Sequence, residues 1–582
     1  MEPLLLGIDF GTGGCKVTAI APDGALAGEA SVEYATRHDH PGWSEQDPAD
    51  WWEALRGALA KLAEKGVDLS RVAALSLDGS THNAVLLGAD WKPVRRTIMW
   101  TDQRSTAECE ALRRSGAAER VFERCYQMPA PTWTLPQLMW LKAHEPDVLA
   151  RTEHVLFVKD YVRHLLTGEA ATDRIEAQGT LFFDMKRQDW DEEFVRMAGL
   201  RPAQLPRLLE PTALAGRVTP EAAAATGLPA GTPVACGTSD SAVEDYGAGA
   251  VEPGDLILKL ATAGNVNAMT AEPHPHPKTL TYGHVVPGMW YSVSATNAAA
   301  LCMRWLRDTF FEVKSAASPP VSGASPLSGP SAPSPLSREA ALSPAGALSR
   351  KAALSPAGAL SRKAALSPAG ALSREAALSP AGALSREAAL SPAGALSRKA
   401  AFNVYARIDA EAATSPVGAN GVMFHPYLQG ERCPYWDANL RASFTGVSIA
   451  STRGDFCRAL MEGVAFSLRD CFRTLEEMEL PARRVFLIGG GARSIFWGEI
   501  VADVFNRAVA IPEPGDASFG AALLAGVAAG FFRDAREAVA RCLRIGHTVE
   551  PEPAAVAQYA ELFARYRAVH DALAPVYQGT RT

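Results

Sequence analysis

The sequence lacks long apolar runs, paired cysteines and a concentrated positive charge, and each absence excludes a class of protein. No stretch approaches the roughly 20 apolar residues that cross a membrane, and the apolar residues 4–8 are too few for a signal peptide. The nine cysteines are scattered without a CxxC pair, which favours free thiols in a reducing compartment over a disulfide or zinc framework. With 57 basic and 64 acidic residues and a net charge of −7, the chain has no basic stripe for nucleic acid. We therefore expect a cytoplasmic protein that binds neither nucleic acid nor a membrane.

The composition is that of a globular protein with more than one domain. Hydrophobic residues make up 47% and charged residues 21% of 582 residues, which is enough for large cores. Apolar runs typical of strands alternate with amphipathic helical patterns, and this indicates an α/β fold. A helix is expected at residues 48–62, with Asp47 as its N-cap and Pro48 in its first turn. Strands are expected at residues 72–78, 155–158, 232–236, 256–260 and 484–488.

A region of low complexity interrupts this pattern at residues 315–401. A twelve-residue unit, Leu-Ser-Arg-Glu/Lys-Ala-Ala-Leu-Ser-Pro-Ala-Gly-Ala, runs five times from Leu336 to Ala395, and a sixth copy starts at Leu396. Each copy has no aromatic residue and carries a proline that interrupts a helix, so it cannot bury enough surface to offset its ordering entropy. We expect an insert that is mobile or transiently helical and leaves a surface loop, with a partner-binding role as the alternative.

The first chemical motif is a glycine-rich hairpin at residues 9–16. The apolar residues 4–8 deliver Asp9 into a turn with three glycines, and the strand resumes at residues 17–21. The dinucleotide fingerprint and the P-loop both lead into a helix instead, so neither describes this segment. An acid beside backbone N–H groups that approach an anion suits a magnesium–nucleotide complex. The alternative is an ordinary glycine-rich hairpin.

Four further motifs follow the ends of expected strands. Residues 77–83 form a polar turn suited to sugar hydroxyls, and residues 237–241 form a small-residue turn around Asp240. Residues 260–265 form a second turn able to hold phosphate. Residues 488–494, followed by Trp497, lead from a strand through glycines into a helix, which suits packing against a nucleobase or ribose.

Each of these motifs also has a purely structural interpretation. Asp240 is a candidate helix N-cap, His82 a candidate turn histidine with its hydrogen bonds satisfied, and residues 489–491 a candidate for tight strand–helix packing. The order and spacing of all five motifs favour a functional site.

In these segments the sequence resembles the FGGY family of carbohydrate kinases, within the actin/hexokinase/Hsp70 superfamily, and most closely its xylulokinases. The resemblance extends from the start of the chain to about residue 532, apart from the insert. The stretches that carry it are residues 9–13, 42–52, 99–104, 159–161, 166–169, 237–240, 424–432, 462–466 and 489–494.

The resemblance implies two RNase H-like domains flanking a cleft. Residues 1–250 would form the N-terminal kinase domain, with the sugar side, the first phosphate motif and the catalytic base. Residues 251–314 and 402–545 would form the C-terminal domain on the nucleotide side. The repeat insert at residues 315–401 would interrupt that domain, and residues 546–582 would form a C-terminal helical extension.

The resemblance also implies roles for individual residues and the ligands ATP and Mg²⁺. Asp240 matches the catalytic base that takes the proton of the attacking sugar hydroxyl, and it would bind the substrate with Thr81 and His82. Asp9 matches the magnesium-associated acid, so it is both a catalytic and a metal residue. The nucleotide-binding positions are Thr12, Gly13, Gly14, Thr262, Gly264, Gly490, Gly491 and Ala492. Positioning, metal charge and one base suffice for phosphoryl transfer.

The chain departs from the xylulokinase pattern at two turns. Residues 261–264 read Ala-Thr-Ala-Gly where xylulokinases usually have Gly-Thr-Ser-Gly, so Ala263 lacks a hydroxyl. Residues 80–83 read Ser-Thr-His-Asn where Gln-Met-His-Gly is usual, so Thr81 replaces a methionine while His82 keeps its place. Glycerol kinases carry an Arg-Glu pair at these two positions, and glycerol is therefore disfavoured.

The substrate we expect is a pentulose such as D-xylulose. L-ribulose, another ketose or a polyol is the alternative within the enzyme class. A non-catalytic sugar-sensing relative is the alternative outside it, and the presence of both Asp9 and Asp240 argues against that. The expected partners are a small sugar and ATP, and a homodimer is left open.

Overall fold

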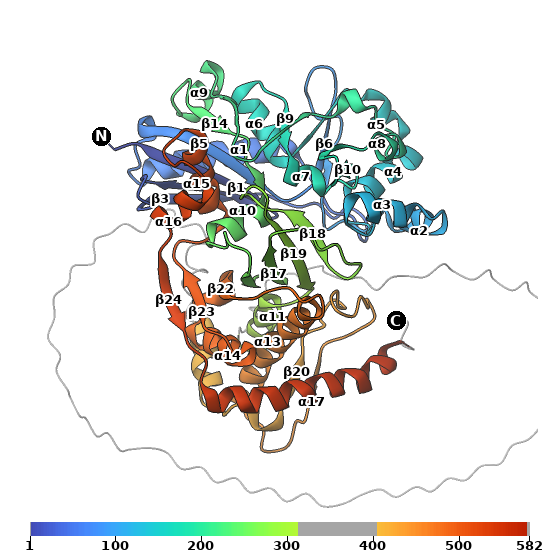
Figure 1. Ribbon diagram of the computed structural model, residues 1–582, viewed down its shortest axis with the longest axis vertical. Coiled ribbons are helices and arrows are strands. Elements are labelled where there is room, and N and C mark those ends of the chain that lie inside the picture. Colours follow the sequence, from blue (N-terminus) through green and yellow to red (C-terminus); the bar gives the residue numbers. More distant parts are fainter. Residues whose placement is uncertain (1, 312–403, 579–582) are drawn as a thin grey trace, which may run out of the picture. The chain divides into compact units, whose positions relative to one another are not determined.

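The computed structural model describes residues 2–311 and 404–578, which contain two seven-stranded sheets (Figure 1). The repeat insert expected at residues 315–401, and its expected mobility, lie outside the described residues. Within the described part of the chain, no helix has both the length and the apolar character that a membrane span requires.

The first sheet has the strand order β13-β14-β5-β1-β2-β3, with β15 paired to β5. An antiparallel hairpin of β1 and β2 lies next to β5, which runs parallel to β1. The strands are β1 (Leu4–Gly11), β2 (Gly14–Ile20), β3 (Leu26–Glu33), β5 (Val72–Gly79), β13 (Leu214–Arg217), β14 (Pro233–Ala235) and β15 (Thr238–Ser239).

Alternation along β1 explains why the sheet has two buried faces. Leu4, Leu6 and Ile8 pack with the helices α1 (Pro48–Glu64), α6 (Val158–Thr167) and α9 (Pro220–Thr226). The carboxylate of Asp47 caps the first turn of α1, as the sequence predicts.

Additional elements between β3 and β14 surround this sheet. They are β4 (Glu45–Gln46), β6 (Ala84–Leu87), β7 (Thr97–Ile98), α2 (Thr106–Arg114), α3 (Ala117–Cys125), α4 (Thr134–His144), α5 (Pro146–Arg151), β8 (His154–Phe157), β9 (Ala171–Asp173), α7 (Arg174–Gln178), β10 (Phe183–Asp184), β11 (Asp189–Trp190), α8 (Glu192–Met197) and β12 (Arg207–Leu209).

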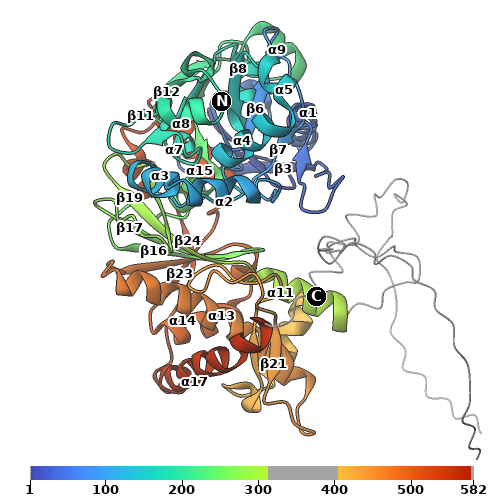
Figure 2. The same cartoon turned by 90° about the vertical axis from the view of Figure 1, so that its right-hand side faces the viewer.

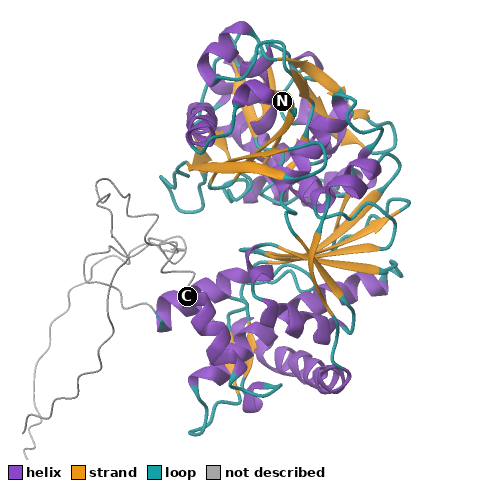
Figure 3. Ribbon diagram, turned by 90° about the vertical axis from the view of Figure 1, so that its left-hand side faces the viewer, coloured by secondary structure: helices purple, strands orange, loops and turns teal. Residues whose placement is uncertain are grey.

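The second sheet repeats the same plan in the order β18-β19-β17-β16-β22-β23-β24. The hairpin of β16 and β17 lies next to a parallel β22, as the β1–β2 hairpin lies next to β5. Figure 3 shows the strands of this sheet fanning with a marked twist. The strands are β16 (Asp255–Leu260), β17 (Gly264–Thr270), β18 (Leu280–Gly283), β19 (Trp290–Thr296), β22 (Arg484–Ile488), β23 (Val509–Pro512) and β24 (Ile545–Val549).

Long helices cover one face of the second sheet (Figure 2). Leu256, Leu258 and Leu260 of β16 pack there with α13 (Arg453–Glu477) and α14 (Ile495–Phe505). The remaining elements are α11 (Ala300–Phe310), a helix at residues 404–413, β20 (Met423–His425), β21 (Ser443–Thr445), α13 (Arg453–Glu477), α14 (Ile495–Phe505), α15 (Ala517–Ala528), α16 (Ala535–Cys542) and α17 (Pro553–Gln578).

The α/β architecture and the five expected strands are confirmed. Those strands correspond to β5, β8, β14, β16 and β22. The packing of α15 is unexpected, because this helix follows β23 of the second sheet yet packs against β1 and β5 of the first sheet (Figure 1). A Cβ atom on Gly7 of β1 would lie 1.8 Å from the carbonyl oxygen of Ser518 in α15, so the helix approaches the strand as closely as backbones allow.

The domain boundaries stay a prediction from the sequence. Packing crosses them at two places. The helix α15 falls within the predicted C-terminal domain but contacts β1, and the predicted extension from residue 546 begins inside β24, which pairs with β23.

Candidate active site

The hairpin turn between β1 and β2 is open at Gly13 and is fixed by side-chain hydrogen bonds to Thr12. Gly11 pairs with Gly14, and nothing lies within 4 Å of the point where a Cβ atom on Gly13 would be. The backbone carbonyl of Thr12 accepts a hydrogen bond from Gln46 Nε2 at 2.7 Å, and its hydroxyl accepts one from Trp100 Nε1 at 3.1 Å. The turn therefore presents free backbone on one side only.

Asp9 and Asp78 form a carboxylate pair at the ends of two parallel strands. They stand opposite each other in the β1–β5 register, on the face that Gly7 presents to α15. Asp78 is fully buried, and neither of its carboxylate oxygens has a hydrogen-bond donor. Burial raises the pKa of both carboxyl groups, and their mutual proximity raises that of Asp78 further. A proton shared within the pair, or a bound cation, would satisfy these oxygens.

Sequence reasoning quoted Asp78 inside the sugar turn but gave it no role. Its signal was available, since Asp78 ends an apolar strand as Asp9 does. Among the described residues, no group of three or more His, Cys, Asp or Glu side chains could hold a metal ion by itself.

Two helices begin at this carboxylate pair. The helix α10 (Asp240–Gly247) starts at Asp240, and Asp516 caps α15 by accepting a hydrogen bond from the backbone N–H of Phe519 at 3.0 Å. Lys16 of β2 holds Asp516 by an ion pair of 2.5 Å. Two electropositive helix N-termini are therefore directed at one region, which suits phosphate.

Asp240 is the first residue of its helix, and Ser239 is the N-cap, so the N-cap interpretation of Asp240 is wrong. Its Oδ1 atom accepts hydrogen bonds from the backbone N–H of Ser241 at 2.7 Å and from the Thr81 hydroxyl at 3.0 Å. Burial raises the pKa of Asp240, and the positive charge of Lys259 is the largest opposing influence. A positive φ of 72° at Gly237 lets the chain turn toward Asp240, with β5 too close for a side chain.

The sugar turn holds His82 in a strained backbone conformation with φ of 54°. Its N–H donates to Glu176 Oε1 at 2.6 Å, and its carbonyl accepts from the Thr134 hydroxyl at 2.5 Å. The ring lies 4.7 Å from that of Trp133, and its Nδ1 atom has no partner. Burial lowers the pKa of His82 to about 3, so the ring is neutral at physiological pH.

The backbone N–H and carbonyl of His82 are thus hydrogen-bonded, whereas its ring Nδ1 atom has no partner, which the structural interpretation of a turn histidine does not account for. Sequence reasoning missed Glu176 and Trp133, because nothing in their local sequence marks them. Glu176 is likewise buried, and its Oε2 atom has no partner.

The second predicted phosphate turn lies between β16 and β17. The backbone carbonyl of Thr262 accepts hydrogen bonds from the N–H groups of Ala299 at 3.0 Å and Leu301 at 3.2 Å, so the start of α11 packs on the turn. The Thr262 hydroxyl accepts a hydrogen bond from Arg304 Nη2 at 2.7 Å. Sequence reasoning missed Arg304, an exposed cation at this turn. The predicted Gly264 is the first residue of β17, directly after the turn.

The predicted adenosine turn follows β22 and approaches the end of β16. Gly490, Gly491 and Ala492 form a short 3-10 segment, and a Cβ atom on Gly491 would lie 2.7 Å from the Leu260 side chain. Nothing lies within 4 Å of the Cβ position of Gly490, so its backbone is open. Trp497 is buried and donates to the Met461 carbonyl at 3.1 Å, which makes it a core residue with no face for a nucleobase.

The structure therefore brings the predicted residues into two groups. Asp9, Asp240 and Thr81 belong to one group, since the charge of Asp240 raises the pKa of Asp9 and Thr81 bonds Asp240. Thr262, Gly264 and the residues 490–492 belong to the other, around the end of β16. Lys259, one residue before the end of β16, pairs with Glu244 of α10 and links the two groups.

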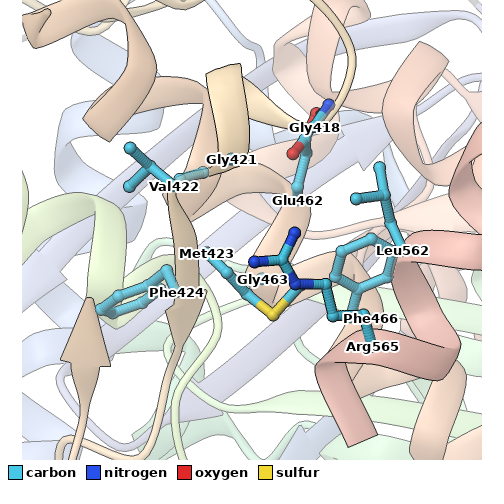
Figure 4. Close-up of a pocket in the computed structure, with 11 residues that line it drawn as sticks. Gly418, Gly421, Val422, Met423, Phe424, Glu462, Gly463, Phe466, Leu562 and Arg565 are labelled. Carbon is cyan, nitrogen blue, oxygen red and sulfur yellow. The ribbon is translucent and has the colours of Figure 1, made fainter. Parts of the chain in front are cut away.

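A separate cavity near α13 is too small to be the sugar site (Figure 4). Its volume of about 10 Å³ has room for roughly one water molecule. Glu462 lines it, but the carboxylate already accepts hydrogen bonds from the Gly418 N–H at 3.0 Å and from Arg458 Nε at 2.8 Å.

Known proteins resemble this chain over nearly its whole length. Sequence profiles of the FGGY family of carbohydrate kinases match residues 4–247 (N-terminal domain) and residues 372–529 (C-terminal domain). A xylulose kinase of Escherichia coli (strain K12) is 29% identical over 90% of this chain and 90% of its own. A xylulose kinase of Staphylococcus epidermidis (strain ATCC 12228 / FDA PCI 1200) is 26% identical over 98% of this chain and 97% of its own.

The solved structures agree with the profiles. The crystal structure of a xyloylose kinase from Brucella ovis matches with a TM-score of 0.76 at 29% identity, covering 98% of this chain and 100% of that chain. The predicted fold class, two α/β domains of this superfamily, is confirmed. Because the two profiles together span more than half of its length, the chain belongs to the FGGY family of carbohydrate kinases, phosphotransferases that act on sugar hydroxyl groups.

Proposed function

We propose that the protein transfers the γ-phosphoryl group of ATP to a hydroxyl of a ketopentose such as D-xylulose, giving D-xylulose 5-phosphate. One observation carries the proposal: the carboxylate of Asp240 accepts a hydrogen bond from Thr81 in the sugar turn, beside the acid of the first phosphate motif. The names of the relatives support the choice of sugar.

Asp240 acts as the general base in this proposal. Its carboxylate takes the proton from the sugar hydroxyl as that oxygen attacks the γ-phosphorus, and the bond from the γ-phosphorus to the β–γ bridging oxygen breaks to release ADP. The hydroxyl of Thr81 and the backbone N–H of Ser241 both bond Oδ1, so they fix the carboxylate orientation and leave the other oxygen for the substrate. The N-terminus of α10 stabilises negative charge that develops nearby.

The neutral His82 and the buried Glu176 are suited to hydrogen bonding with sugar hydroxyl groups. Both carry an unpartnered polar atom, Nδ1 of His82 and Oε2 of Glu176, and an unpaired buried group favours a ligand that can satisfy it. The ring of Trp133 next to His82 offers an apolar face for the carbons of the sugar.

The donor set at Asp9 fits a divalent cation. Two carboxylates on adjacent strands, with the Asp78 oxygens orphaned and buried, match the preference of Mg²⁺ for one or two carboxylates together with phosphate oxygens. Asp9 and Asp78 would hold the ion. When bound, it would neutralise charge on the β- and γ-phosphates.

The nucleotide would lie along the open backbones. Gly13 and Gly490 are the two predicted positions with no atom near a would-be Cβ, which leaves room for phosphate and adenosine. The predicted nucleotide-binding set stays as proposed from the sequence: Thr12, Gly13, Gly14, Thr262, Gly264, Gly490, Gly491 and Ala492. A homodimer and a cytoplasmic location also stay as predictions.

The second candidate is a kinase for L-ribulose, another ketose or a polyol. The hydroxyl of Thr81 faces Asp240, where a methionine common in xylulokinases would present only apolar contact. This extra polar group favours a substrate whose hydroxyl pattern differs from that of D-xylulose.

A coupled ADP-release screen over ketopentoses, ketohexoses, polyols and gluconate tests the proposal. We expect the highest kcat/KM with a ketopentose. The Thr81→Met variant should change the ranking among ketopentoses by up to a few hundred-fold, as about 1–3 kcal/mol of contact allows. A wild-type preference for a polyol or an aldonic acid would contradict the assignment of the sugar.

A further inference from the structure

We propose that Lys259 is a positioning residue for phosphoryl transfer: paired with Glu244, its ammonium group reaches from the second sheet to the helix face that carries Asp240 and places a positive charge beside the proposed base. This inference rests on the proposed role of Asp240.

The alternation of β16 directs Lys259 toward α10. Leu256, Leu258 and Leu260 point into the core beneath the second sheet, whereas Ile257 belongs to a different core cluster that includes Val243 of α10. Lys259 follows Ile257 by two residues, so its side chain leaves the same face of the sheet. Lys259 therefore lies on a central strand, directly before the predicted phosphate turn. Its charged side chain contributes nothing to the hydrophobic cores that its neighbours on β16 form.

The ammonium group of Lys259 forms an ion pair with Glu244 Oε2, and these side chains are only 23% and 16% exposed. Glu244 lies four residues after Asp240 in α10, so the two acids share one face of the helix. Lys259 therefore meets the same helix face that carries the proposed base. A second tie supports this geometry, because both carboxylate oxygens of Asp245 in α10 accept hydrogen bonds from Asn267 Nδ2 of β17 at 3.0 and 2.8 Å.

Most of the titratable groups around Asp240 are acidic. Its neighbours on other elements are Asp9 of β1 and Asp78 of β5, and Glu244 lies on its own helix. The hydroxyl groups of Tyr34, Tyr282 of β18 and Tyr291 of β19 also interact with its charge. Among these interacting groups of the described chain, Lys259 alone is positive, and its charge opposes the effect of burial by lowering the pKa of Asp240.

The same arrangement couples the two halves of the site. Lys259 directly precedes the predicted second phosphate turn at residues 260–265, while Asp240 begins the helix next to the first phosphate motif. A shift of β16 relative to α10 would move the ammonium group away from the base. Activity and the relative position of the two sheets are therefore linked through one side chain.

The test compares the Lys259→Met and Lys259→Arg variants of the full chain by the pH dependence of kcat/KM. Loss of the cation favours the neutral acid, so the pKa of Asp240 rises and the acid limb of the Lys259→Met profile moves to higher pH. A displacement of one pH unit lowers kcat/KM about tenfold on that limb and leaves the plateau at high pH much less affected. Lys259→Arg keeps the charge and should restore the wild-type limb.

Arg484→Met is the matched control. Arg484 pairs with the buried Asp255 at 2.6 Å, at the opposite end of β16, so this variant also removes a cation from a buried acid on the same strand. It should lower stability without moving the acid limb. If Lys259→Met does not fold, because Glu244 is left buried and unpaired, the Lys259→Met/Glu244→Gln double variant removes both charges and should show a smaller shift in the same direction.

The outcomes separate this inference from the proposed function. A folded Lys259→Met or double variant with the wild-type acid limb would overturn the role of Lys259, provided that Asp240→Asn is inactive. An active Asp240→Asn would overturn the proposed base itself. An equal shift in Arg484→Met would show a general effect of lost stability and would also overturn the inference.

Discussion

At the scale of single residues, the site concentrates buried negative charge. The charges of Asp9, Asp78 and Asp240 influence one another, as do those of Glu244 and Asp516, and burial is the largest cause that raises the pKa of the first three. For Asp9 the pKa rises from 3.8 to about 7. The unfolded chain loses this proton near pH 4, whereas the folded chain keeps it up to about pH 7. The folded state therefore loses stability as the pH rises through that window.

The Asp9→Asn variant should avoid much of the loss of stability that the folded protein undergoes when Asp9 ionises. We expect the variant without metal to melt at a higher temperature than the wild type at pH 8, with a smaller difference at pH 4. It should also lose activity, and added Mg²⁺ should raise its melting temperature less than that of the wild type. Asp245→Asn is the control, because it changes another buried acid, whose pKa is about 8, away from the Asp9–Asp78 pair and should keep the Mg²⁺ response. An undiminished Mg²⁺ response in Asp9→Asn would show that Asp9 holds no cation.

At the scale of secondary-structure elements, α10 and α15 cross with their backbones in contact. A Cβ atom on Gly520 of α15 would lie 2.2 Å from the Val243 carbonyl of α10 and 3.1 Å from Gly247 Cα. Each of these helices begins at a carboxylate of the site, Asp240 in α10 and the capping Asp516 in α15. The crossing therefore fixes the distance between the two helix N-termini.

Gly520→Ala should force the two helices apart. We expect a loss of about 1–3 kcal/mol in stability from overpacking, together with a lower kcat, since both helix N-termini shift. Gly498→Ala in α14 is the matched control, because its nearest neighbour would be 3.6 Å away and alanine favours a helix by about 1 kcal/mol. Denaturant unfolding of both variants measures the difference. Equal stability of the two would mean that the crossing tolerates a methyl group.

At the scale of the whole molecule, the described residues just before the gap at residues 312–403 contact those just after it. Arg307 Nη1 of α11 donates to the Tyr405 hydroxyl at 2.7 Å, and the Arg407 guanidinium lies 5.4 Å from the ring centroid of Phe311. Short linkers can therefore join these ends. Each doubling of loop length costs only about 0.6 kcal/mol, so the domain tolerates an insertion here.

Replacing residues 316–400 with a short Gly/Ser linker should leave kcat and thermal stability nearly unchanged. The repeat sequence contains no histidine, cysteine or aspartate and no aromatic residue, so it offers neither a cluster of metal ligands nor an aromatic platform. Steady-state kinetics and thermal unfolding measure the effect. A loss of activity in the shortened chain, or strong hydrogen-exchange protection across the repeats of the full chain, would show that the insert is structural.

The sequence predicts those features that depend on local patterns. Asp9 and Asp240 stand out because each ends an apolar run at a small-residue turn, and Asp47 because it precedes Pro48 and an amphipathic run. Features that depend on packing between distant segments are missed. The approach of α15 to Gly7, the pairing of Lys259 with Glu244 and the contact of Arg304 with Thr262 join residues far apart in the chain. Trp497 was misinterpreted for the same reason, since only the packing of α13 and α14 shows that it is buried.

The most direct test of this account is the turnover of Asp240→Asn with the preferred ketopentose, measured by coupled ADP release. The variant should keep its fold and its affinity for ATP, since an amide of the same shape can still accept hydrogen bonds from Thr81 and Ser241. The account predicts a loss of about 10²–10⁴-fold in kcat, which is the usual contribution of a general base. Turnover within a few-fold of the wild type, with ATP affinity unchanged, would contradict it.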